Sequence, residues 1–417
     1  MFLGLQSVAY QVDDLEKGKE WYSRVFEADP MVEEETFVAF FVGGQGLILR
    51  RGSGGKVDAA NGAIAYWGVS DINAEFDRLL SFGATEHSSV TELRQGVHLA
   101  AVRDPFGNIF GIRGMSGRPD NEAIETKPSR TALWTTLMRA YAAGEEIGEI
   151  RGPDTVAEIF LPGDQAAAIR DPEGRQRVKE QDFVIGVYEY VMARTRFFDQ
   201  CLGSVLREGI DQLVFLGAGF DSRPYRFINE IGRMRVFELD VPPTLDHKKR
   251  CLAKAGIAMP EGLQHVPINF NTQSLKEVLD AAGYDPDGKT LFMWEGVTYY
   301  LAADAVEDTL AFIKGHSPAG SSVVFDYIAL WPGIMEAYGV KELIEFNSRN
   351  QSGERGGYFS LEQGTIGDFL SNRGFEIVER QRPADLERNY LTLPDGTLFG
   401  NVTGSFRMVQ ARNKSEG

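Results

Sequence analysis

The sequence contains few residues that could form covalent or metal cross-links. Two of its 417 residues are cysteines, Cys201 and Cys251, and neither belongs to a CxxC motif or to a cluster with histidine. Disulfide frameworks and structural zinc sites need several cysteines or histidines at short spacings. We therefore expect two reduced thiols, with neither a disulfide nor a bound zinc ion.

Positive charge and long apolar runs are also scarce. Lysine and arginine number 43 against 60 acidic residues, which gives a formal net charge of −17. A chain of this charge is repelled by phosphate backbones and by anionic lipid, so we expect neither nucleic-acid nor membrane partners. The longest apolar runs, such as residues 212–219, are too short to cross a membrane. The N-terminus lacks the basic segment and cleavage site of a signal peptide, so we expect a cytoplasmic protein.

The length of the chain exceeds one compact core, which predicts more than one domain. The polar stretch SGRPDNEAIETK at 116–127 has no helical or strand period and contains glycine and proline. Such composition is typical of a linker. We therefore expect one domain at 1–115 and a second at 128–417.

The first domain contains the same pattern twice. A strand-like stretch at 5–12 precedes the helical pattern LEKGKEWYSRVF, which Asp13 and Asp14 can cap, and two strand-like stretches follow. The second copy starts at residue 63, continues with the helical pattern INAEFDRLLSFG, and ends in two strands joined by the turn DPFGN. The sequence therefore predicts an α+β domain of two βαβββ modules.

The second domain begins with helical patterns and then alternates short apolar runs with helices. The apolar runs are LVFLGAG, MRVFELDV, LQHVPINF, TLFMWEGV and SSVVFDYI, separated by helical patterns at 243–255, 273–282 and 303–314. Alternation of this kind predicts parallel strands joined by crossover helices. The fold class is therefore α/β, a doubly wound sheet with a helical N-terminal cap. The tail predicts a helix at 361–373, a strand at 376–381 and a final strand pair near 404–411.

The first of these strands ends in the turn Gly217-Ala218-Gly219. Glycines let the backbone approach a ligand, and the helix that follows offers free N–H groups. A structural turn explains such a motif equally well, and so does a nicotinamide-binding site. However, the third glycine of the dinucleotide motif is replaced by Ser222, which weakens the nicotinamide interpretation.

Polar residues follow three further strands. Asp240, Asn269 and Glu295 each end an apolar run. Because the carboxyl ends of parallel strands meet at one edge of a sheet, these side chains are expected to line a ligand site. Asp240 is interpreted as the residue that holds a ribose, although an aspartate here also suits a helix N-cap.

Residues 128–381 resemble the leucine carboxyl methyltransferase family, a branch of the S-adenosylmethionine-dependent methyltransferases. The resemblance rests on six motifs in order, SRTALWTTLMRA, ARTRFFD, LGAGFDSRPYR, FELDVPPTLDHKK, VPINF and WEGVTYYL. It implies S-adenosylmethionine as the cofactor. The cofactor-binding residues that it implies are Arg130, Arg194, Gly217, Ala218, Gly219, Asp240, Asn269, Phe270 and Glu295.

The resemblance also implies a role for each of these residues. Arg194, with Arg130 as a second contact, binds the methionine carboxylate of the cofactor, and the glycine turn lines it. Asp240 holds the ribose, Asn269 and Phe270 hold the adenine, and Glu295 lies near the amino group and the acceptor. Asn269 departs from the aspartate that is usual in the family, which weakens adenine binding without excluding it.

The chemical class of the methyl acceptor determines whether the reaction needs a general base. The methyl group of a sulfonium is already activated, so an oxygen nucleophile needs mainly correct positioning. A carboxylate needs no base, whereas a phenol or alcohol does, and the candidate catalytic residues are Glu295, Tyr299 and Tyr300. The aromatic residues of the tail are expected to form the acceptor pocket, with Arg355 as an anion contact. They are Trp331, Phe359, Tyr390 and Phe399.

The first domain resembles the glyoxalase and bleomycin-resistance family, the vicinal oxygen chelate fold. The resemblance rests on VDDLEKGKEWYSRVF, VSDINAEFDRLLSFGA and DPFGNIFGIR. Enzymes of that family hold a divalent metal with His, Gln or Glu on four strands. The matching positions here, Ser7, Ile48, Ile64 and Gly111, offer no such ligand, so we predict no metal.

Two hypotheses about function follow. The first is an enzyme that methylates an oxygen, carboxyl or hydroxyl, of a small-molecule acceptor, for example in natural-product metabolism. The second is a ligand-binding or resistance protein whose methyltransferase half is inactive. The sequence leaves open the acceptor, the role of the first domain and whether the chain forms a homodimer.

Overall fold

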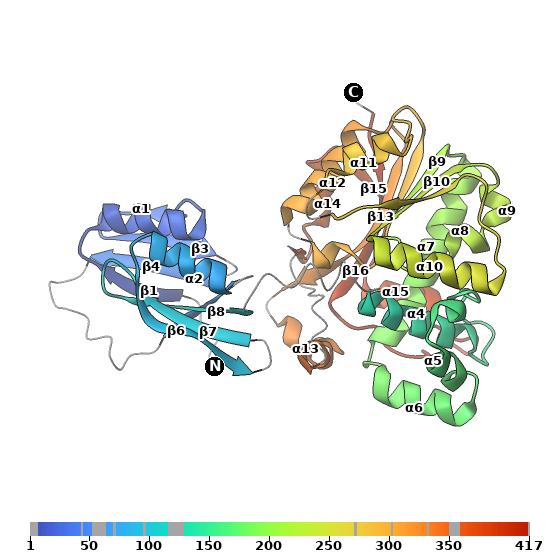
Figure 1. Cartoon of the computed structure of the whole chain (residues 1–417), viewed down its shortest axis with the longest axis horizontal. Helices are drawn as coiled ribbons and strands as arrows, with labels where there is room; N and C mark the ends of the chain where they lie inside the picture. The colour runs from blue at the N-terminus through green and yellow to red at the C-terminus, as the bar shows by residue number, and fades with distance from the viewer. Residues whose placement is uncertain are drawn as a thin grey trace. The chain divides into compact units, whose positions relative to one another are not determined.

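The computed structural model describes residues 7–42, 45–51, 64–69, 72–94, 97–115, 129–270, 273–301, 303–331, 333–349 and 359–415 (Figure 1). By its internal contacts the chain divides into two compact units, Met1–Asn121 and Glu122–Gly417. Neither cysteine forms a disulfide. Among the described residues, no helix is both long and apolar enough to cross a membrane.

The N-terminal unit consists of two βαβββ modules, as the repeated pattern predicts. In each module the first strand pairs in parallel with the last strand, and the remaining neighbours are antiparallel. The sheet orders are β1-β4-β3-β2 and β5-β8-β7-β6. The elements are β1 (Ser7–Val12), α1 (Leu15–Phe26), β2 (Val32–Glu33), β3 (Phe37–Val42), β4 (Gln45–Arg51), β5 (Tyr66–Gly68), α2 (Ile72–Ser81), β6 (Thr85–Arg94), β7 (Val97–Arg103) and β8 (Ile109–Met115).

Helix α1 shows how the sequence specifies this unit. The Asp14 side chain accepts hydrogen bonds from the backbone N–H groups of Glu16 and Lys17, which satisfies donors that the first helical turn leaves free. The apolar residues at helical spacing, among them Trp21 and Tyr22, are buried against both modules. The helix thereby joins the two modules through one apolar core.

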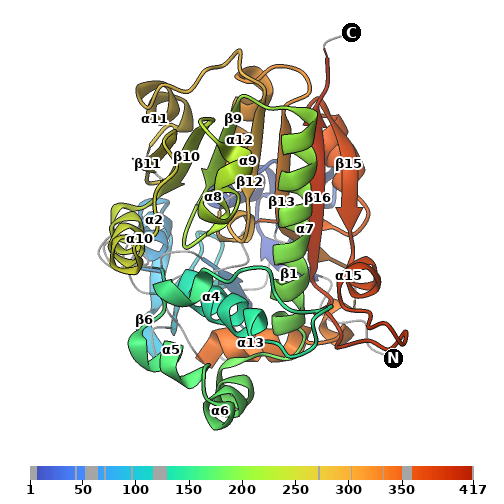
Figure 2. The ribbon, with the colours of Figure 1, turned by 90° about the vertical axis from the view of Figure 1, so that its right-hand side faces the viewer.

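The C-terminal unit is a twisted sheet between two layers of helices (Figure 2). The strands are β9 (Gln212–Leu216), β10 (Arg235–Asp240), β11 (Leu263–Pro267), β12 (Thr290–Trp294), β13 (Ser322–Leu330), β14 (Ser360–Glu362), β15 (Phe375–Gln381) and β16 (Phe406–Asn413). The helices are α4 (Arg130–Ala143), η2 (Ala157–Phe160), α5 (Gly163–Ala168), α6 (Pro172–Asp182), α7 (Val187–Glu208), α8 (Arg223–Arg226), α9 (Ile228–Ile231), α10 (Pro242–Ala255), α11 (Leu275–Ala281), η3 (Thr298–Tyr300), α12 (Ala303–Gly315), η4 (Ile334–Glu336), α13 (Val340–Arg349), α14 (Ile366–Ser371) and α15 (Pro383–Tyr390).

The strand order is β11-β10-β9-β12-β13-β16-β15, and β9 to β13 are parallel. The chain leaves β9 toward β10 on one side and returns to β12 on the other. Such a reversal is where ligands bind in open α/β sheets. One apolar core lies between the sheet and α4, α7 and α15, and a second lies between the sheet and α11, α12 and α14. The doubly wound fold with a helical N-terminal part is confirmed.

The predicted tail helix at 361–373 is wrong. Residues Ser360–Glu362 form β14, which pairs with β13, and helix α14 covers only Ile366–Ser371. Gly364 between them has φ of +97°, a left-handed conformation that no α-helix contains. The apolar periodicity comes from a strand and a short helix that both pack on one core. The final strand is β16, which lies between β13 and β15.

Candidate functional site

The site begins where three central strands change from buried to partly exposed. All residues of β9 and β12 are buried, and β10 is buried from Val236 to Leu239. The residues that come next, Gly217, Asp240 and Glu295, are each half-buried. Since the three strands are parallel neighbours, these residues share one edge of the sheet. The structure therefore brings together three of the four strand ends that the sequence predicts as a ligand site.

The turn after β9 needs glycine for two separate reasons. Gly217 has φ of +70° and Gly219 has φ of +45°, both in the left-handed region. A Cβ atom at Gly217 would also lie 2.5 Å from Cγ2 of Val297, which follows Glu295. Only a residue without a side chain lets this turn approach the loop after β12 so closely.

Asp240 is bonded to the glycine turn and not to the helix that follows it. Its Oδ2 accepts a hydrogen bond of 2.6 Å from the Gly219 N–H, and its Oδ1 accepts one of 2.7 Å from the Val241 N–H. The N-cap of α10 is Val241, without a side-chain cap, so Asp240 does not have the helix-capping role. Burial raises the pKa of Asp240 to about 6, although both backbone N–H groups act in the opposite direction. Near neutral pH the group is a desolvated carboxylate, a strong acceptor for hydroxyl groups.

Arg194 lies beneath this edge between two carboxylates. Its Nε is 2.9 Å from Oε1 of Glu295, and its Nη1 is 3.1 Å from Oδ2 of Asp326 on β13. Asp326 is fully buried and also accepts hydrogen bonds from the Tyr190 hydroxyl at 2.6 Å and from the Gly296 N–H at 2.7 Å. Arg194 itself is 4% exposed, so these ion pairs are buried and do not lie on a helix surface. Among the described residues, the hydrogen bonds of its guanidinium come from Nη1, to Tyr299 and Asp326, and neither Nη2 nor the buried Nε donates one.

A second buried guanidinium completes the charge network, and sequence reasoning missed it. Arg223 is 1% exposed, and three carboxylates lie within 2.7 Å of it, those of Asp199, Asp221 and Glu295. The signal for it was present, because Asp221 and Arg223 both stand in the motif LGAGFDSRPYR directly after a buried strand. Asp326 was missed as well, although a single carboxylate within the apolar run SSVVFDYI is the same signal that identified Glu295.

The network fixes the protonation of two candidate catalytic groups. Burial raises the pKa of Glu295, but the guanidinium groups of Arg223 and Arg194 outweigh it and hold the pKa below the ordinary value. Burial and the Asp326 carboxylate raise the pKa of Tyr299 well above the ordinary value. Tyr299 also donates to Asp326 at 3.4 Å. At neutral pH the site thus presents an ionised Glu295 and a protonated Tyr299, while Tyr300 lies half-buried beside them.

The remaining predicted residues lie around this centre. Asn269 and Phe270 follow β11 and are half-buried, and the Asn269 N–H donates to Gln273 Oε1 at 2.8 Å. The Ile268 N–H bonds to the Asp240 carbonyl, which holds this segment beside Asp240. Arg130 is exposed and is the first residue of α4. Two positions later, Cβ of Ala132 lies 3.5 Å from where a Cβ atom at Gly219 would be. The roles of these residues stay predictions.

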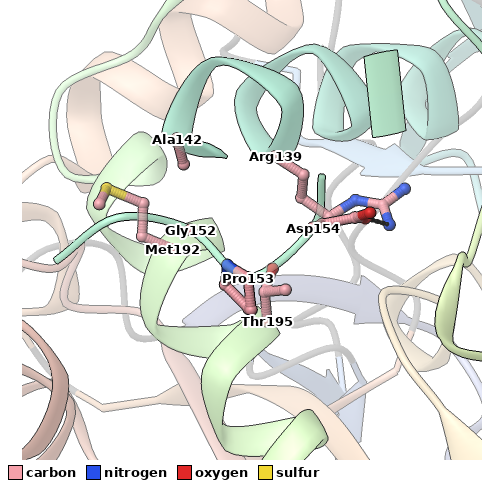
Figure 3. Close-up of a pocket in the computed structure, with 7 residues that line it drawn as sticks. All are labelled: Arg139, Ala142, Gly152, Pro153, Asp154, Met192 and Thr195. Atoms are coloured by element: carbon pink, nitrogen blue, oxygen red, sulfur yellow. Dashed lines mark hydrogen bonds and ion pairs between the residues drawn. The ribbon is translucent and has the colours of Figure 1, made fainter. Parts of the chain in front are cut away.

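A narrow space lies beneath α4 (Figure 3). It is bordered by the ion pair between Arg139 and Asp154, whose atoms are 2.7 Å apart, and by Thr195 of α7. Asp154 also accepts a hydrogen bond from Ser222. None of the predicted cofactor-binding residues lines this space.

The four aromatic residues expected to form an acceptor pocket do not gather in one place. Trp331 and Phe359 belong to the core on the α12 face of the sheet. Tyr390 and Phe399 pack into the other core, where the Tyr390 hydroxyl donates to Gln200 of α7. The prediction of one pocket is wrong, because the chain places these residues on opposite faces. Arg355 lies outside the described residues.

In the N-terminal unit, the positions matched to metal ligands lie on strands or next to them. Ser7 is exposed in β1, Ile48 is half-buried in β4, and Gly111 is buried in β8, opposite Tyr66. Ile64 precedes β5 and is half-buried. In the part of the chain that the structure describes, no three His, Cys, Asp or Glu residues are grouped as metal ligands would be.

Comparison with known proteins gives a match for each unit. The profile of the family described as leucine carboxyl methyltransferase matches residues 132–314, and that of the glyoxalase/bleomycin resistance protein/dioxygenase superfamily matches residues 4–112. A protein of Mycolicibacterium smegmatis, provisionally named an S-adenosyl-L-methionine-dependent methyltransferase, is 32% identical over 315 residues, which are 71% of this chain and 99% of that protein.

A second relative and one solved structure are also similar to part of the chain. A protein of Mycolicibacterium paratuberculosis with the same provisional name is 32% identical over 217 residues, covering 51% of this chain and 70% of that protein. Among solved structures, the magnesium protoporphyrin IX methyltransferase of Synechocystis with bound SAH is 9% identical, with a TM-score of 0.36 over 62% of this chain and 99% of that one.

Proposed function

The chain belongs to the leucine carboxyl methyltransferase family, and we propose that it transfers the methyl group of S-adenosylmethionine to an oxygen of a small-molecule acceptor. One observation supports this proposal above the others. The glycine turn, Asp240 and the pair of Arg194 and Glu295 meet at the edge of the sheet where the strand order reverses.

The residues at this edge fit the parts of the cofactor. The Gly217 turn has no room for a Cβ, and it presents backbone to a ligand. Asp240 offers a carboxylate to the ribose hydroxyls, and Asn269 with Phe270 lies on the neighbouring strand end, where the adenine would lie. Glu295 offers a carboxylate to the amino group, and Nη2 of Arg194 remains available for the methionine carboxylate. When bound, the cofactor supplies an activated methyl group on a sulfonium.

The protonation of the site favours an acidic acceptor. A phenol or an alcohol must lose a proton, but Tyr299 is held protonated and Glu295 is engaged by two guanidinium groups. A carboxylate acceptor needs no base and only has to be oriented toward the methyl group. We therefore propose carboxyl methylation, with Glu295, Tyr299 and Tyr300 as residues that orient the acceptor.

Calorimetry with S-adenosylhomocysteine on the full chain tests the first step. We expect micromolar binding by the wild type and a loss of about 100-fold in Asp240→Ala, because two charge-assisted hydrogen bonds disappear. Asp246→Ala is the matched control, since Asp246 is an exposed acid on the following helix. No binding by the wild type, together with no effect of Asp240→Ala, contradicts the proposal. Binding without methyl transfer to any acceptor favours the alternative of an inactive methyltransferase half.

A further inference from the structure

The structure describes four buried arginines, and one of them differs from the others. Arg139, Arg194 and Arg223 each lie within 3.1 Å of at least one carboxylate oxygen. Arg407 on β16 is equally buried, with 7% of its surface exposed, yet it has no carboxylate within ion-pair distance among the described residues. A buried charge without a counter-ion is costly. For the other three buried arginines, the chain itself supplies a carboxylate as the counter-ion.

The hydrogen bonds of Arg407 leave one side of its guanidinium unused. Nη1 donates to the carbonyl oxygens of Gly404 at 2.6 Å and Phe406 at 2.8 Å. Nε and Nη2 donate to no described residue, and neither atom is completely buried. This Nε–Nη2 edge is the one that binds a carboxylate through two parallel hydrogen bonds.

The position of Arg407 relates it to the site described above. Arg407 pairs with Tyr327 on β13, next to Asp326, which holds Arg194. Since Trp294 of β12 pairs with Phe325 of β13, Arg407 lies at the same end of the sheet as Glu295. The Arg407 guanidinium lies over the ring of Trp331, 5.4 Å from its centre, and Trp331 is a half-buried residue that directly follows β13. Arg407 and Trp331 thus form a cation–π contact at this end of the sheet.

Other charges near Arg407 do not neutralise it. Burial lowers the pKa of Arg407 and the positive charge of Arg382 lowers it further, whereas the Asp385 carboxylate acts in the opposite direction. The carboxylate of Asp385 is bound by Arg382 and Arg388, at 2.9 Å each. Asp385 is thus held by two other arginines, so none of the described carboxylates pairs with Arg407 directly.

We infer that Arg407 is the residue that recognises the acidic group of the methyl acceptor, with Trp331 contacting the apolar body of the same molecule. This inference rests on the proposed function and deepens it, because it names the acceptor class as apolar or aromatic carboxylic acids. It also assigns a role to Trp331, the predicted pocket residue that lies beside Arg407.

The test measures the binding of matched acids and amides to the full chain saturated with S-adenosylhomocysteine. The probes are benzoate, phenylacetate and 2-naphthoate, each compared with its carboxamide. Their binding is measured by ligand-detected NMR at millimolar concentration. We expect each acid to bind at least about tenfold more tightly than its amide, since a charge-assisted bidentate pair is lost with the amide. Wild type that binds no acid, or binds the amides equally well, overturns the inference without any variant.

Variants then show whether Arg407 causes the preference for acids over amides. Arg407→Met is expected to remove it and Arg407→Lys to reduce it, because an ammonium keeps the charge without the two-pronged geometry. Arg412→Gln, on the same strand and paired with Glu208, is the control that keeps the preference. If Arg407→Met does not fold, Arg407→Lys decides, and an unchanged preference in either variant overturns the inference. Failure of the wild type to bind S-adenosylhomocysteine contradicts the proposed function instead, so the two failures are distinguishable.

Discussion

The two units of the chain use buried polar residues in different ways. In the described part of the N-terminal unit, the buried polar residues are Asp104 and Asn108, and both belong to one hairpin turn. Asp104 accepts hydrogen bonds from the Tyr22 hydroxyl at 2.6 Å, from the Asn108 side chain and from two backbone N–H groups. The Asn108 side chain also bonds to the backbone of Gln11 on β1, so these bonds join the turn to the first module and serve the fold.

In the C-terminal unit the buried charges form a connected network that ends at a partly exposed edge. Arg223 joins Asp199 to Glu295, Glu295 joins Arg223 to Arg194, and Arg194 joins Glu295 to Asp326. A network of this kind is rarely the cheapest way to stabilise a core, because desolvation offsets the attraction between the charges. The difference shows that the cost of buried charge concentrates in the unit where groups must be held in position for a ligand.

The largest expected effect comes from breaking the network at its centre. Arg223→Met leaves three carboxylates without their shared cation, so we expect the unfolding free energy of the C-terminal unit to fall by about 3–5 kcal/mol. Calorimetric or chemical unfolding, with the transition of each unit followed separately, measures it. Arg233→Met is the control, because the Arg233–Glu261 pair is exposed and its loss should change little. Equal stability of Arg223→Met and wild type would show that the network does not hold the unit together.

The glycine turn provides the next effect in size. Gly217→Ala combines a left-handed backbone cost of about 1–2 kcal/mol with a clash against Val297, so we expect S-adenosylhomocysteine affinity to fall more than tenfold. Gly283→Ala has a similar φ of +82° but open space around it, and it isolates the backbone cost in a stability measurement. Val297→Ala in the Gly217→Ala background should restore part of the affinity. If the double variant binds no better than Gly217→Ala, the close contact is not what excludes a side chain.

The pKa of Asp240 predicts opposite effects of pH on binding and on stability. Because the folded pKa is raised to about 6, the stability contribution of this group is present at low pH and is lost as pH rises through about 6. Cofactor binding needs the ionised form, so S-adenosylhomocysteine affinity should fall about tenfold by one pH unit below that pKa. Titration calorimetry across this range measures the fall, and Asp240→Asn should remove the dependence. A wild-type affinity that stays constant through this range would contradict the ribose role.

Sequence reasoning located the edge of the site because the signals were local. Each strand is an apolar run, and Asp240 and Glu295 are charges at the ends of such runs, so their neighbourhood follows from parallel pairing alone. The partners of Arg194 could not be predicted in the same way. Asp326 is 132 residues away along the chain, and its contact depends on the register of β13 and on the direction of the Arg194 side chain from α7.

The same distinction explains the errors in the tail. The apolar spacing of residues 361–373 fits a helix, but Gly364 divides it into a strand and a short helix, and only the tertiary pairing with β13 reveals the strand. The four aromatic residues were expected to form one pocket because all of them belong to the tail of the chain. However, alternation along the strands and the path of α15 send Phe359 and Tyr390 to opposite faces. Proximity along the chain is a weak guide wherever strand pairing decides the face.

The smallest expected effect comes from a variant in the N-terminal unit, where the buried polar residues are expected to serve only the fold. Asp104→Asn keeps the shape of the side chain but replaces one acceptor oxygen by an NH2 donor. In the wild type, Asp104 Oδ2 accepts from the Tyr22 hydroxyl and from the side-chain NH2 group of Asn108, so the new donor would face one of these two donors. Burial raises the pKa of Asp104, so part of this loss is offset by removal of a desolvated charge. We expect the N-terminal unit to lose about 1–2 kcal/mol of stability, with S-adenosylhomocysteine affinity unchanged. A clear loss of affinity in this variant would mean that the turn contributes to the cofactor site, and the division of roles between the two units would then be wrong.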